Sequence, residues 1–313
     1  MGSHRLSDIA IVPGSAHPAL AADVARILAA PVVPVELERF PDGELSVRLL
    51  EPVRALSSVI VQPTGPPVDA NLVELLALAD ACRRAAAARV IAVVPYVGYA
   101  RGDRRHGIRQ PIMASLAAQL LQTAGVAHLL AVDLHTPQIE GFFHIPVDDL
   151  SPFASLLKAV RPDLPPDVVV VSPDLGRLGL ATRYADELHS GVAVVHKRRL
   201  SGRQTESLQI VGDVRDRPCL IVDDMITTGG TVAGCIEALL RSGARPTILV
   251  AATHGLFVAD AAERLRHAAV CKIWVTDTLP QPASGTGRLV VPVAPIIAAA
   301  IEQLRPSGGP GRH

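Results

Sequence analysis

The feature that most constrains the fold is a strand–helix–strand order that occurs twice along the chain. In each copy a short apolar run precedes a helical pattern, and a second apolar run follows it. The first copy comprises Ile9–Val12, Ala19–Leu28 and Val32–Leu37, and the second, about 160 residues later, comprises Val168–Val171, Leu178–Leu188 and Val192–Val195. This repetition predicts an internal duplication.

The correspondence continues through the rest of each half. Val59–Gln62, Asn71–Ala85 and Val90–Val94 match Leu220–Val222, Val232–Leu240 and Ile248–Ala251, and Pro111–Thr123 with Leu129–Asp133 matches Val258–His267 with Lys272–Thr276. Alternating strands and helices form parallel sheets with helices on both faces. We therefore expect an α/β protein with two tandem, doubly wound parallel-sheet domains, residues 1–155 and 156–305. The join falls in the proline-containing segment 150–167, and residues 306–313 form a disordered tail.

The composition fits two globular domains and argues against several classes of partner. The 313 residues are 49% hydrophobic, which is ample for two cores. The net charge is zero and the pI is near 7.2, so no overall field attracts nucleic acid or a membrane surface. The four cysteines lack metal-ligand spacing, and the apolar segment 289–301 is too short to span a bilayer. We expect a cytoplasmic protein that binds neither nucleic acid nor membranes.

One stretch of the second half carries much of the predicted chemistry. Asp223 and Asp224 follow a short apolar run, which predicts a buried parallel strand with both acids at its carboxyl end. Small or hydroxyl-bearing residues then lead into a helical pattern: Thr227, Thr228, Gly229, Gly230 and Thr231. Glycines let a ligand approach the backbone, and unpaired N–H groups at a helix start favour phosphate. An ordinary strand-to-helix turn explains the glycines alone, but not their combination with acids and threonines.

This stretch resembles the phosphoribosyl-diphosphate binding loop of type I phosphoribosyltransferases and of ribose-phosphate diphosphokinases. The resemblance implies that Asp223 and Asp224 bind the hydroxyls of ribose 5-phosphate, and that Thr227–Thr231 bind its 5-phosphate. The first half has Gln62–Pro67 at the corresponding place and lacks this loop. Both domains would then be of phosphoribosyltransferase type, and only the second would keep a sugar-phosphate site.

The loop Phe40–Glu44 resembles the diphosphokinase loop that reaches the adenine of ATP, often across a subunit boundary. It contains Asp-Gly, a turn-forming pair, so a surface hairpin is the alternative interpretation. By the resemblance, Phe40 offers an aromatic surface to the base, and Asp42, Gly43 and Glu44 complete the contact. An adenine site that a neighbouring subunit completes implies a homo-oligomer, at least a dimer and, by the resemblance, a hexamer.

The loop Tyr99–Arg105 resembles a second ATP-binding motif of the same family. Several arginines on one loop often form only a solvated face, although guanidinium groups suit bidentate binding of phosphate. By the resemblance, Arg101 contacts ATP. Gly102 stands where the family usually has glutamine, so we expect this chain to lack one side-chain contact to the nucleotide.

Asp133 and His135 follow a predicted strand of the first half. In an extended backbone they alternate and point the same way, which fits shared coordination of Mg²⁺ near a phosphate chain, whereas a lone histidine is more often structural. In the diphosphokinases the corresponding histidine is a metal ligand beside ATP. Asp174, which closes the first strand of the second half, resembles the other metal-linked carboxylate of the family.

Lys197 and Arg199 end the next strand and begin a polar loop through Glu206. A basic loop beside a phosphate site can close over the substrate and neutralise charge as it develops, whereas the alternative is a solvated basic turn. The resemblance identifies these two residues as mobile catalytic cations.

Together these motifs indicate a Mg²⁺-dependent ribose-phosphate diphosphokinase with ATP and ribose 5-phosphate as substrates. Two alternatives remain at this stage. A phosphoribosyltransferase would consume phosphoribosyl diphosphate, and this explains Asp223–Thr231 but leaves the first half without a purpose. A regulatory subunit that has lost activity would account for the departures from the family at Gly102, His144 and Thr227, but not for the retained Lys197.

Overall fold

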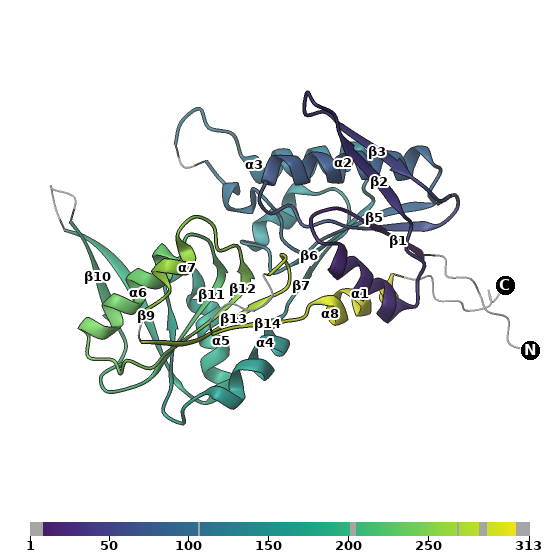
Figure 1. Ribbon diagram of the computed structural model, residues 1–313. Helices are drawn as coiled ribbons and strands as arrows, with labels where there is room; N and C mark the ends of the chain where they lie inside the picture. The colour runs from purple at the N-terminus through teal and green to yellow at the C-terminus, as the bar shows by residue number, and fades with distance from the viewer. Residues whose placement is uncertain (1–8, 106, 201–204, 268, 282–286, 305–313) are drawn as a thin grey trace, which may run out of the picture. The chain divides into compact units, whose positions relative to one another are not determined.

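The computed structural model describes residues 9–105, 107–200, 205–267, 269–281 and 287–304, and the side chains of 197–207 are outside this description. The chain divides into two compact units, each with its own sheet (Figure 1). One unit runs to Ser151 and takes in Thr278–Pro280 and the residues from Val293 onward, and the other comprises Pro152–Asp277 and Gln281–Pro292. The expected tail at 306–313 lies outside the described residues. No helix among the described residues is long and apolar enough to cross a membrane.

The first unit is built on a five-stranded parallel sheet with the strand order β1-β4-β5-β6-β7. These strands are β1 (Ile9–Pro13), β4 (Ser57–Val61), β5 (Arg89–Val94), β6 (His128–Val132) and β7 (Val147–Leu150). α2 (Val68–Arg84) and α3 (Met113–Ala124) cover one face, and α1 (Pro18–Leu28) and α8 (Ala294–Gln303) cover the other. Because both faces are covered, the central strands are almost continuously apolar.

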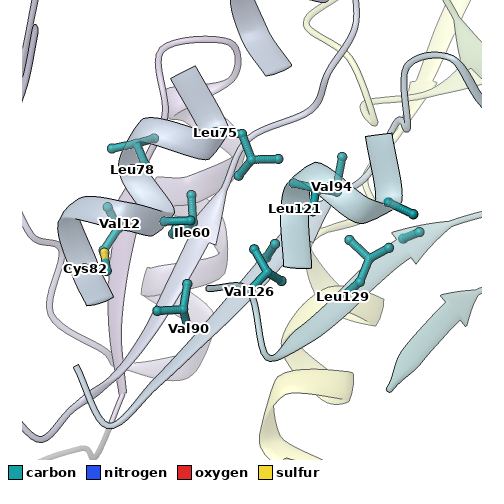
Figure 2. Close-up of a cluster of buried hydrophobic side chains, with 14 of the residues drawn as sticks. Val12, Ile60, Leu75, Leu78, Cys82, Val90, Val94, Leu121, Val126 and Leu129 are labelled. Atoms are coloured by element: carbon teal, nitrogen blue, oxygen red, sulfur yellow. The ribbon is translucent and has the colours of Figure 1, made fainter. Parts of the chain in front are cut away.

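The core under α2 and α3 is drawn in Figure 2. Ile60 and Val90 project from neighbouring strands towards Leu75 and Leu78 of α2 and towards Leu121 of α3. Leu75, Leu78 and Ile60 are completely buried. The spacing of the two leucines on α2 is the sequence signal that this face of the helix turns inward.

The second unit repeats this plan with two extra strands. Its sheet has the order β10-β9-β8-β11-β12-β13-β14, and β8 onward runs parallel, in the same order as the first sheet. The strands are β8 (Val169–Ser172), β9 (Gly191–Leu200), β10 (Thr205–Val211), β11 (Cys219–Ile226), β12 (Ile248–Gly255), β13 (Val270–Thr276) and β14 (Arg288–Val291). α4 (Phe153–Val160) and α5 (Leu178–Leu188) cover one face, and α6 (Gly230–Arg241) and the short α7 (Ala261–Arg264) cover the other. The matching strand orders agree with an internal duplication.

The two units divide between Ser151 and Pro152, within the segment 150–167 where we expected the join. This segment also contains α4, whose apolar residues pack in the core over β13. A predicted segment further along the chain differs from the structure. The polar loop expected after His196 is instead a two-stranded ribbon in which β9 pairs antiparallel with β10.

Val32–Leu37 is not a strand of the main sheet. β2 (Val35–Arg39) forms a separate hairpin with β3 (Leu45–Leu49), and Val32 makes only an isolated bridge to Ile11. The expected helix at 258–267 is also much shorter, since α7 has only four residues.

The C-terminal helix belongs with the first unit, whereas we expected all of 156–305 to form the second domain. Val293, Ile297 and Ile301 are buried in one cluster with Leu20 and Val24 of α1. This apolar contact covers the face of the first sheet that α1 alone leaves open, which explains why the chain returns to that sheet at its end.

We predict that Ile297→Ala lowers the free energy of unfolding by about 2–5 kcal/mol, because it leaves a cavity in a fully buried contact. Urea unfolding followed by circular dichroism measures the change. Ile27→Ala is the control: Ile27 lies on α1 but is 41% exposed, so its replacement should cost less than about 1 kcal/mol. Equal losses for the two variants would contradict the packing of α8 on α1.

Candidate active site

The acid pair lies inside a strand, not after one as the apolar run predicted. β11 continues to Ile226 because its ladder with β12 continues, with Asp223 opposite Ala252. Its pairing with β8 ends at Ile221, so the acids lie beyond the end of that neighbouring ladder. Both residues are nonetheless buried, with 7% of Asp223 and 3% of Asp224 exposed when backbone and side chain are taken together. Two adjacent buried acids require a counter-charge or strong hydrogen bonds.

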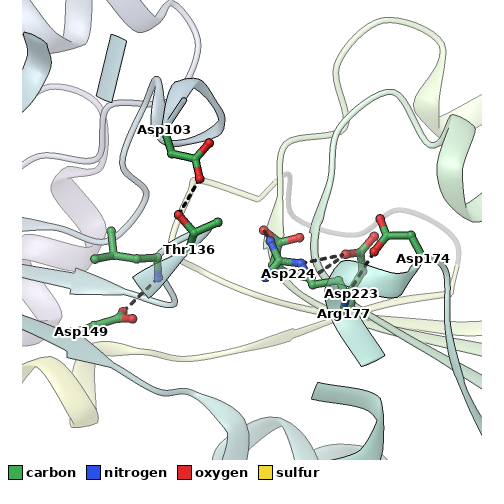
Figure 3. Close-up of polar contacts among 8 residues, drawn as sticks. Asp103, Thr136, Asp149, Asp174, Arg177, Asp223 and Asp224 are labelled. Carbon is green, nitrogen blue, oxygen red and sulfur yellow. Dashed lines mark hydrogen bonds and ion pairs between the residues drawn. The ribbon is translucent and has the colours of Figure 1, made fainter. Parts of the chain in front are cut away.

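Arg177 supplies that counter-charge. Its Nη2 donates to Asp224 Oδ2 at 2.5 Å, and its Nε lies 3.9 Å from Asp223 Oδ1 (Figure 3). The backbone N–H of Asp224 donates to Asp223 Oδ1 at 2.8 Å. Burial raises the pKa of Asp223 well above its ordinary value, the neighbouring Asp224 charge raises it further, and Arg177 acts in the opposite direction.

The loop after β11 is short and ends in a glycine that the backbone requires. Gly229 has φ of +73° and forms the N-cap of α6, and a Cβ added there would lie 3.2 Å from Leu265 Cγ. The first N–H groups of α6 have no partner within the helix and point towards its N-terminal end. Thr228, Gly230 and Thr231 line a cavity of about 400 Å³ at this helix start. Thr227 precedes them, and its carbonyl accepts from Val258 N–H at 3.0 Å.

Arg177 connects Asp174 to the acid pair. It follows β8 and caps the 3₁₀ turn η4 (Leu175–Arg177), where its Oδ1 accepts from the backbone N–H of Arg177 at 3.1 Å. Ser172 Oγ donates to the Asp174 carbonyl at 2.6 Å. Arg177 therefore contacts all three carboxylate residues of the second unit's candidate site (Figure 3).

In the first unit, Asp133 and His135 follow β6, but not in the extended conformation that their alternation assumed. β6 ends at Val132, and Asp133 has φ of +52°. Aspartate tolerates this left-handed conformation better than most residues, and its backbone N–H donates to Leu150 O at 3.0 Å. The pairing of β6 with β7 reaches only Val132 and Leu150, and the chain turns at Asp133, so the spacing of Asp133 and His135 does not establish that they share a face.

Asp149 is a neighbour of this turn that the sequence motifs did not identify. Its Oδ1 accepts from Leu134 N–H at 3.0 Å (Figure 3). Burial raises the pKa of Asp149, and the charges of Asp133 and Glu140 act in the same direction. Several carboxylates therefore gather at the carboxyl ends of β6 and β7, which is where ligands bind in open parallel sheets.

The loop with Arg101 and Gly102 meets the same end of the first sheet. Asp103 accepts a hydrogen bond from Thr136 Oγ1 at 2.8 Å, which links this loop to the segment after β6 (Figure 3). Arg101 is exposed. A Cβ at Gly102 would lie 3.1 Å from Met113 Cβ, so the start of α3 leaves little room for a side chain there.

The loop Phe40–Glu44 is the tip of the β2–β3 hairpin. Gly43 has φ of +93°, and its N–H donates to Phe40 O at 2.8 Å, while Asp42 Oδ1 accepts from Glu44 N–H at 3.1 Å. The surface hairpin was the alternative interpretation of this motif, and it is compatible with binding. Phe40 is 44% exposed at the tip, where an aromatic face is accessible.

Lys197 and Arg199 belong to β9, opposite Leu208 and Glu206 of β10, and their side chains lie outside the described part of the chain. The second unit brings together Asp174, Asp223, Asp224 and the small-residue loop. Arg177, which joins them, is not among the site residues that the sequence motifs identified. A basic residue three positions after Asp174 was the available signal, but nothing local indicates a contact with a strand 46 or more residues later.

Comparison with known proteins identifies relatives along nearly the whole chain. Residues 9–125 match the model for the N-terminal domain of ribose phosphate pyrophosphokinase, and residues 198–305 match the phosphoribosyl synthetase-associated domain. A ribose-phosphate pyrophosphokinase of Clostridium perfringens is 42% identical over 302 residues, 95% of this chain and 94% of that protein. One from Corynebacterium efficiens is 41% identical over 307 residues, 96% of this chain and 94% of the relative.

The crystal structure of phosphoribosylpyrophosphate synthetase from Mycobacterium smegmatis superposes on this structure with a TM-score of 0.88. It is 38% identical in sequence, and the match covers 95% of this chain and 98% of that one. These comparisons confirm the predicted α/β fold class and the resemblance to the diphosphokinases.

We predict that Asp223→Asn stabilises the protein, and that the gain grows with pH. Because the pKa of Asp223 is raised, the folded state holds this proton more tightly than the unfolded chain. The wild type therefore loses stability as pH rises from 3.8 through the raised value, and a neutral amide avoids that loss.

Melting temperatures by circular dichroism between about pH 5 and about pH 8 measure this difference, with the exposed Asp186→Asn as the control. A variant that is less stable than the wild type at the upper end of this range would show that the buried charge is fully compensated.

Proposed function

The chain belongs to the ribose-phosphate pyrophosphokinase family, and from this premise we propose how its residues divide the work of the reaction. It is an enzyme that makes phosphoribosyl pyrophosphate from ribose 5-phosphate and ATP. The anomeric hydroxyl loses its proton to water and its oxygen forms a bond to the β-phosphorus of ATP, the bond from this phosphorus to the α–β bridging oxygen breaks, and AMP leaves. The residue assignment rests mainly on the buried acid pair, which is separated from the start of α6 by one short loop.

Ribose 5-phosphate binds to the second unit in this proposal. Asp223 and Asp224 accept hydrogen bonds from the ribose hydroxyls, which suits buried carboxylates held as acceptors. The 5-phosphate occupies the cavity lined by Thr228, Gly230 and Thr231. Backbone N–H groups of the helix start and threonine hydroxyls donate to its oxygens, while the helix dipole favours its charge.

ATP binds to residues of the first unit. Phe40 contacts adenine, with Asp42, Gly43 and Glu44 shaping the hairpin tip that presents it. Arg101 contacts the phosphates, and Gly102 contributes backbone only. The exposed Phe40 also supports a homo-oligomer, at least a dimer and by family resemblance a hexamer, since one face of a base on an open hairpin tip needs a second surface to exclude water.

Mg²⁺ is the metal that this chemistry implies, and the donor set fits it in part. Among the described residues no group of three or more His, Cys, Asp or Glu is arranged to hold a metal. Magnesium bound with nucleotides needs only one or two protein carboxylates, because phosphate oxygens and water complete its shell. Asp133 and His135 beside the crowded Asp149, and Asp174 in the second unit, meet this lesser requirement. When bound, the metal neutralises phosphate charge and orients the phosphate chain.

Lys197 and Arg199 stabilise the charge that develops on the transferred diphosphoryl group. Positive groups that act mainly in the transition state raise kcat more than they lower KM. They lie on β9, whose earlier part pairs with β8, and Asp174 follows shortly after the end of β8; this arrangement supports the assignment.

The assay that tests the proposed function uses the purified chain with ATP, Mg²⁺ and ribose 5-phosphate, and follows the release of AMP. A parallel reaction with phosphoribosyl diphosphate and a nucleobase tests the phosphoribosyltransferase alternative. AMP release that depends on ribose 5-phosphate supports the proposal. A folded chain that is silent in both reactions would instead be the inactive regulatory subunit.

We predict that Lys197→Ala lowers kcat by about 100- to 1,000-fold and changes KM for either substrate much less, because the lysine acts on the transition state. The AMP assay measures both parameters. Lys158→Ala is the matched control, since Lys158 is exposed on α4 and should leave kcat unchanged. Unchanged turnover in Lys197→Ala would remove this residue from the mechanism.

We predict that Gly229→Ala raises KM for ribose 5-phosphate by about tenfold, because a Cβ at left-handed φ strains the start of α6. Isothermal titration with ribose 5-phosphate checks whether the effect is on binding. Gly179→Ala is the control: it also adds one methyl group, but its Cβ meets nothing within 4 Å. If both variants bind like the wild type, the phosphate lies elsewhere.

A further inference from the structure

Arg177 is an enclosed charged residue beside the acid pair, and the proposed reaction gives it no role of its own. Its side chain is 17% exposed, while those of Asp223 and Asp224 are 9% and 4% exposed. A surface ion pair of arginine contributes little, but this contact is enclosed and spans two neighbouring strands' ends. An enclosed arginine needs a negative charge close by, and the acid pair provides it.

Three connections fix where the guanidinium group lies. Asp174 caps η4 through the backbone N–H of Arg177, which sets the position of the Arg177 backbone. The side chain then reaches Asp224 with Nη2 and approaches Asp223 with Nε. One residue therefore ties the carboxyl end of β8 to the acidic part of β11, where the two strands no longer pair.

We propose that Arg177 is a positioning residue that holds the Asp223–Asp224 pair in the orientation that receives the hydroxyls of ribose 5-phosphate. This inference rests on the proposed function and adds the residue that prepares the site for its substrate. Arg177 does not contact the reacting atoms. Its effect reaches the sugar through the two carboxylates.

The chemistry of the carboxylate makes the two tasks compatible. An ionised carboxylate has about four lone-pair positions, so a carboxylate can accept from Arg177 and from a sugar hydroxyl at the same time. Without the guanidinium group the two like charges repel each other at close range and their side chains turn apart. The substrate would then have to restore the arrangement at the expense of its own binding energy.

The test compares Arg177→Met and Arg177→Lys with the wild type. Methionine keeps much of the length and removes the charge, whereas lysine keeps the charge but loses the planar fork that reaches both acids. We expect Arg177→Met to raise the Kd for ribose 5-phosphate, measured by titration calorimetry without ATP or metal, by about tenfold or more. Arg177→Lys should give a smaller rise, and KM for ATP should stay near the wild-type value in both.

Arg241→Met is the matched control, because Arg241 is 63% exposed on α6 in an ion pair with Glu237 and should bind ribose 5-phosphate like the wild type. An unchanged Kd in the Arg177 variants overturns the proposal, and a lower Kd overturns it by making Arg177 an obstruction of the site. If Arg177→Met does not fold, as circular dichroism would reveal, Arg177→Lys decides, and a wild-type Kd for that variant rejects the role of the fork.

The outcome separates this inference from the proposed function. A wild-type chain that binds no ribose 5-phosphate and releases no AMP refutes the function itself. A wild type that is active, together with Arg177 variants that have an unchanged Kd, refutes only the positioning role. A rise in KM for both substrates alike would indicate a general loss of structure, and it too would contradict the proposal.

Discussion

The burial of two adjacent carboxylates is the constraint on which the second unit's site depends. Asp223 and Asp224 lie buried on β11, and the pKa of Asp223 is raised because desolvation and the second acid both disfavour its charge. A protein that stabilised only its fold would place apolar residues at these positions. The pair therefore makes the folded protein less stable than apolar residues would, and in return it provides strong hydrogen-bond acceptors.

The duplicated first unit shows what the same position becomes without that constraint. Gln62 follows β4 where the acid pair follows the corresponding apolar run, and its Oε1 accepts from Ala16 N–H at 3.0 Å. Asn71 donates to Gly65 O at 2.8 Å, and Thr64 Oγ1 accepts from Gly98 N–H at 2.7 Å. The polar groups of this loop are thus bonded to the loop itself and to its neighbours. The two units share a strand order, but in the first unit the polar groups of this loop form hydrogen bonds within the protein.

The sequence predicts the parts of this protein that local physics determines. Apolar runs such as Val90–Val94 and the turn at Asp42-Gly43 carry their structure in their own residues, and both occur where they were expected. Contacts between distant residues have no such local signal. Arg177 meets Asp224 only because β8 and β11 are neighbours, and α8 packs on α1 only because one face of the first sheet needs a cover.

The same distinction explains the errors within the candidate site. The alternation of Asp133 and His135 assumed an extended backbone, but the pairing of β6 with β7 stops at Val132 and the chain turns at Asp133. The apolar run predicted that β11 ends at Val222, but the ladder to β12 continues through the acids. In both cases hydrogen bonds to a neighbouring strand, which the local sequence does not encode, decide where a strand ends.

The two proposed catalytic cations lie on the ribbon of β9 and β10, and one of them is closer than the other to the part of β9 that pairs with the main sheet. In the described pairings β9 meets β8 only as far as Val194, and from there it is held by β10. Leu208, opposite Lys197, packs against the core of the second unit, whereas Arg199 lies opposite Glu206, further along the ribbon. The backbone at Lys197 is therefore tied to the sheet through its partner strand, and that at Arg199 depends more on the ribbon alone. A charge that acts in the transition state benefits most from a fixed position. We therefore expect Lys197 to contribute the larger share of the proposed catalytic effect.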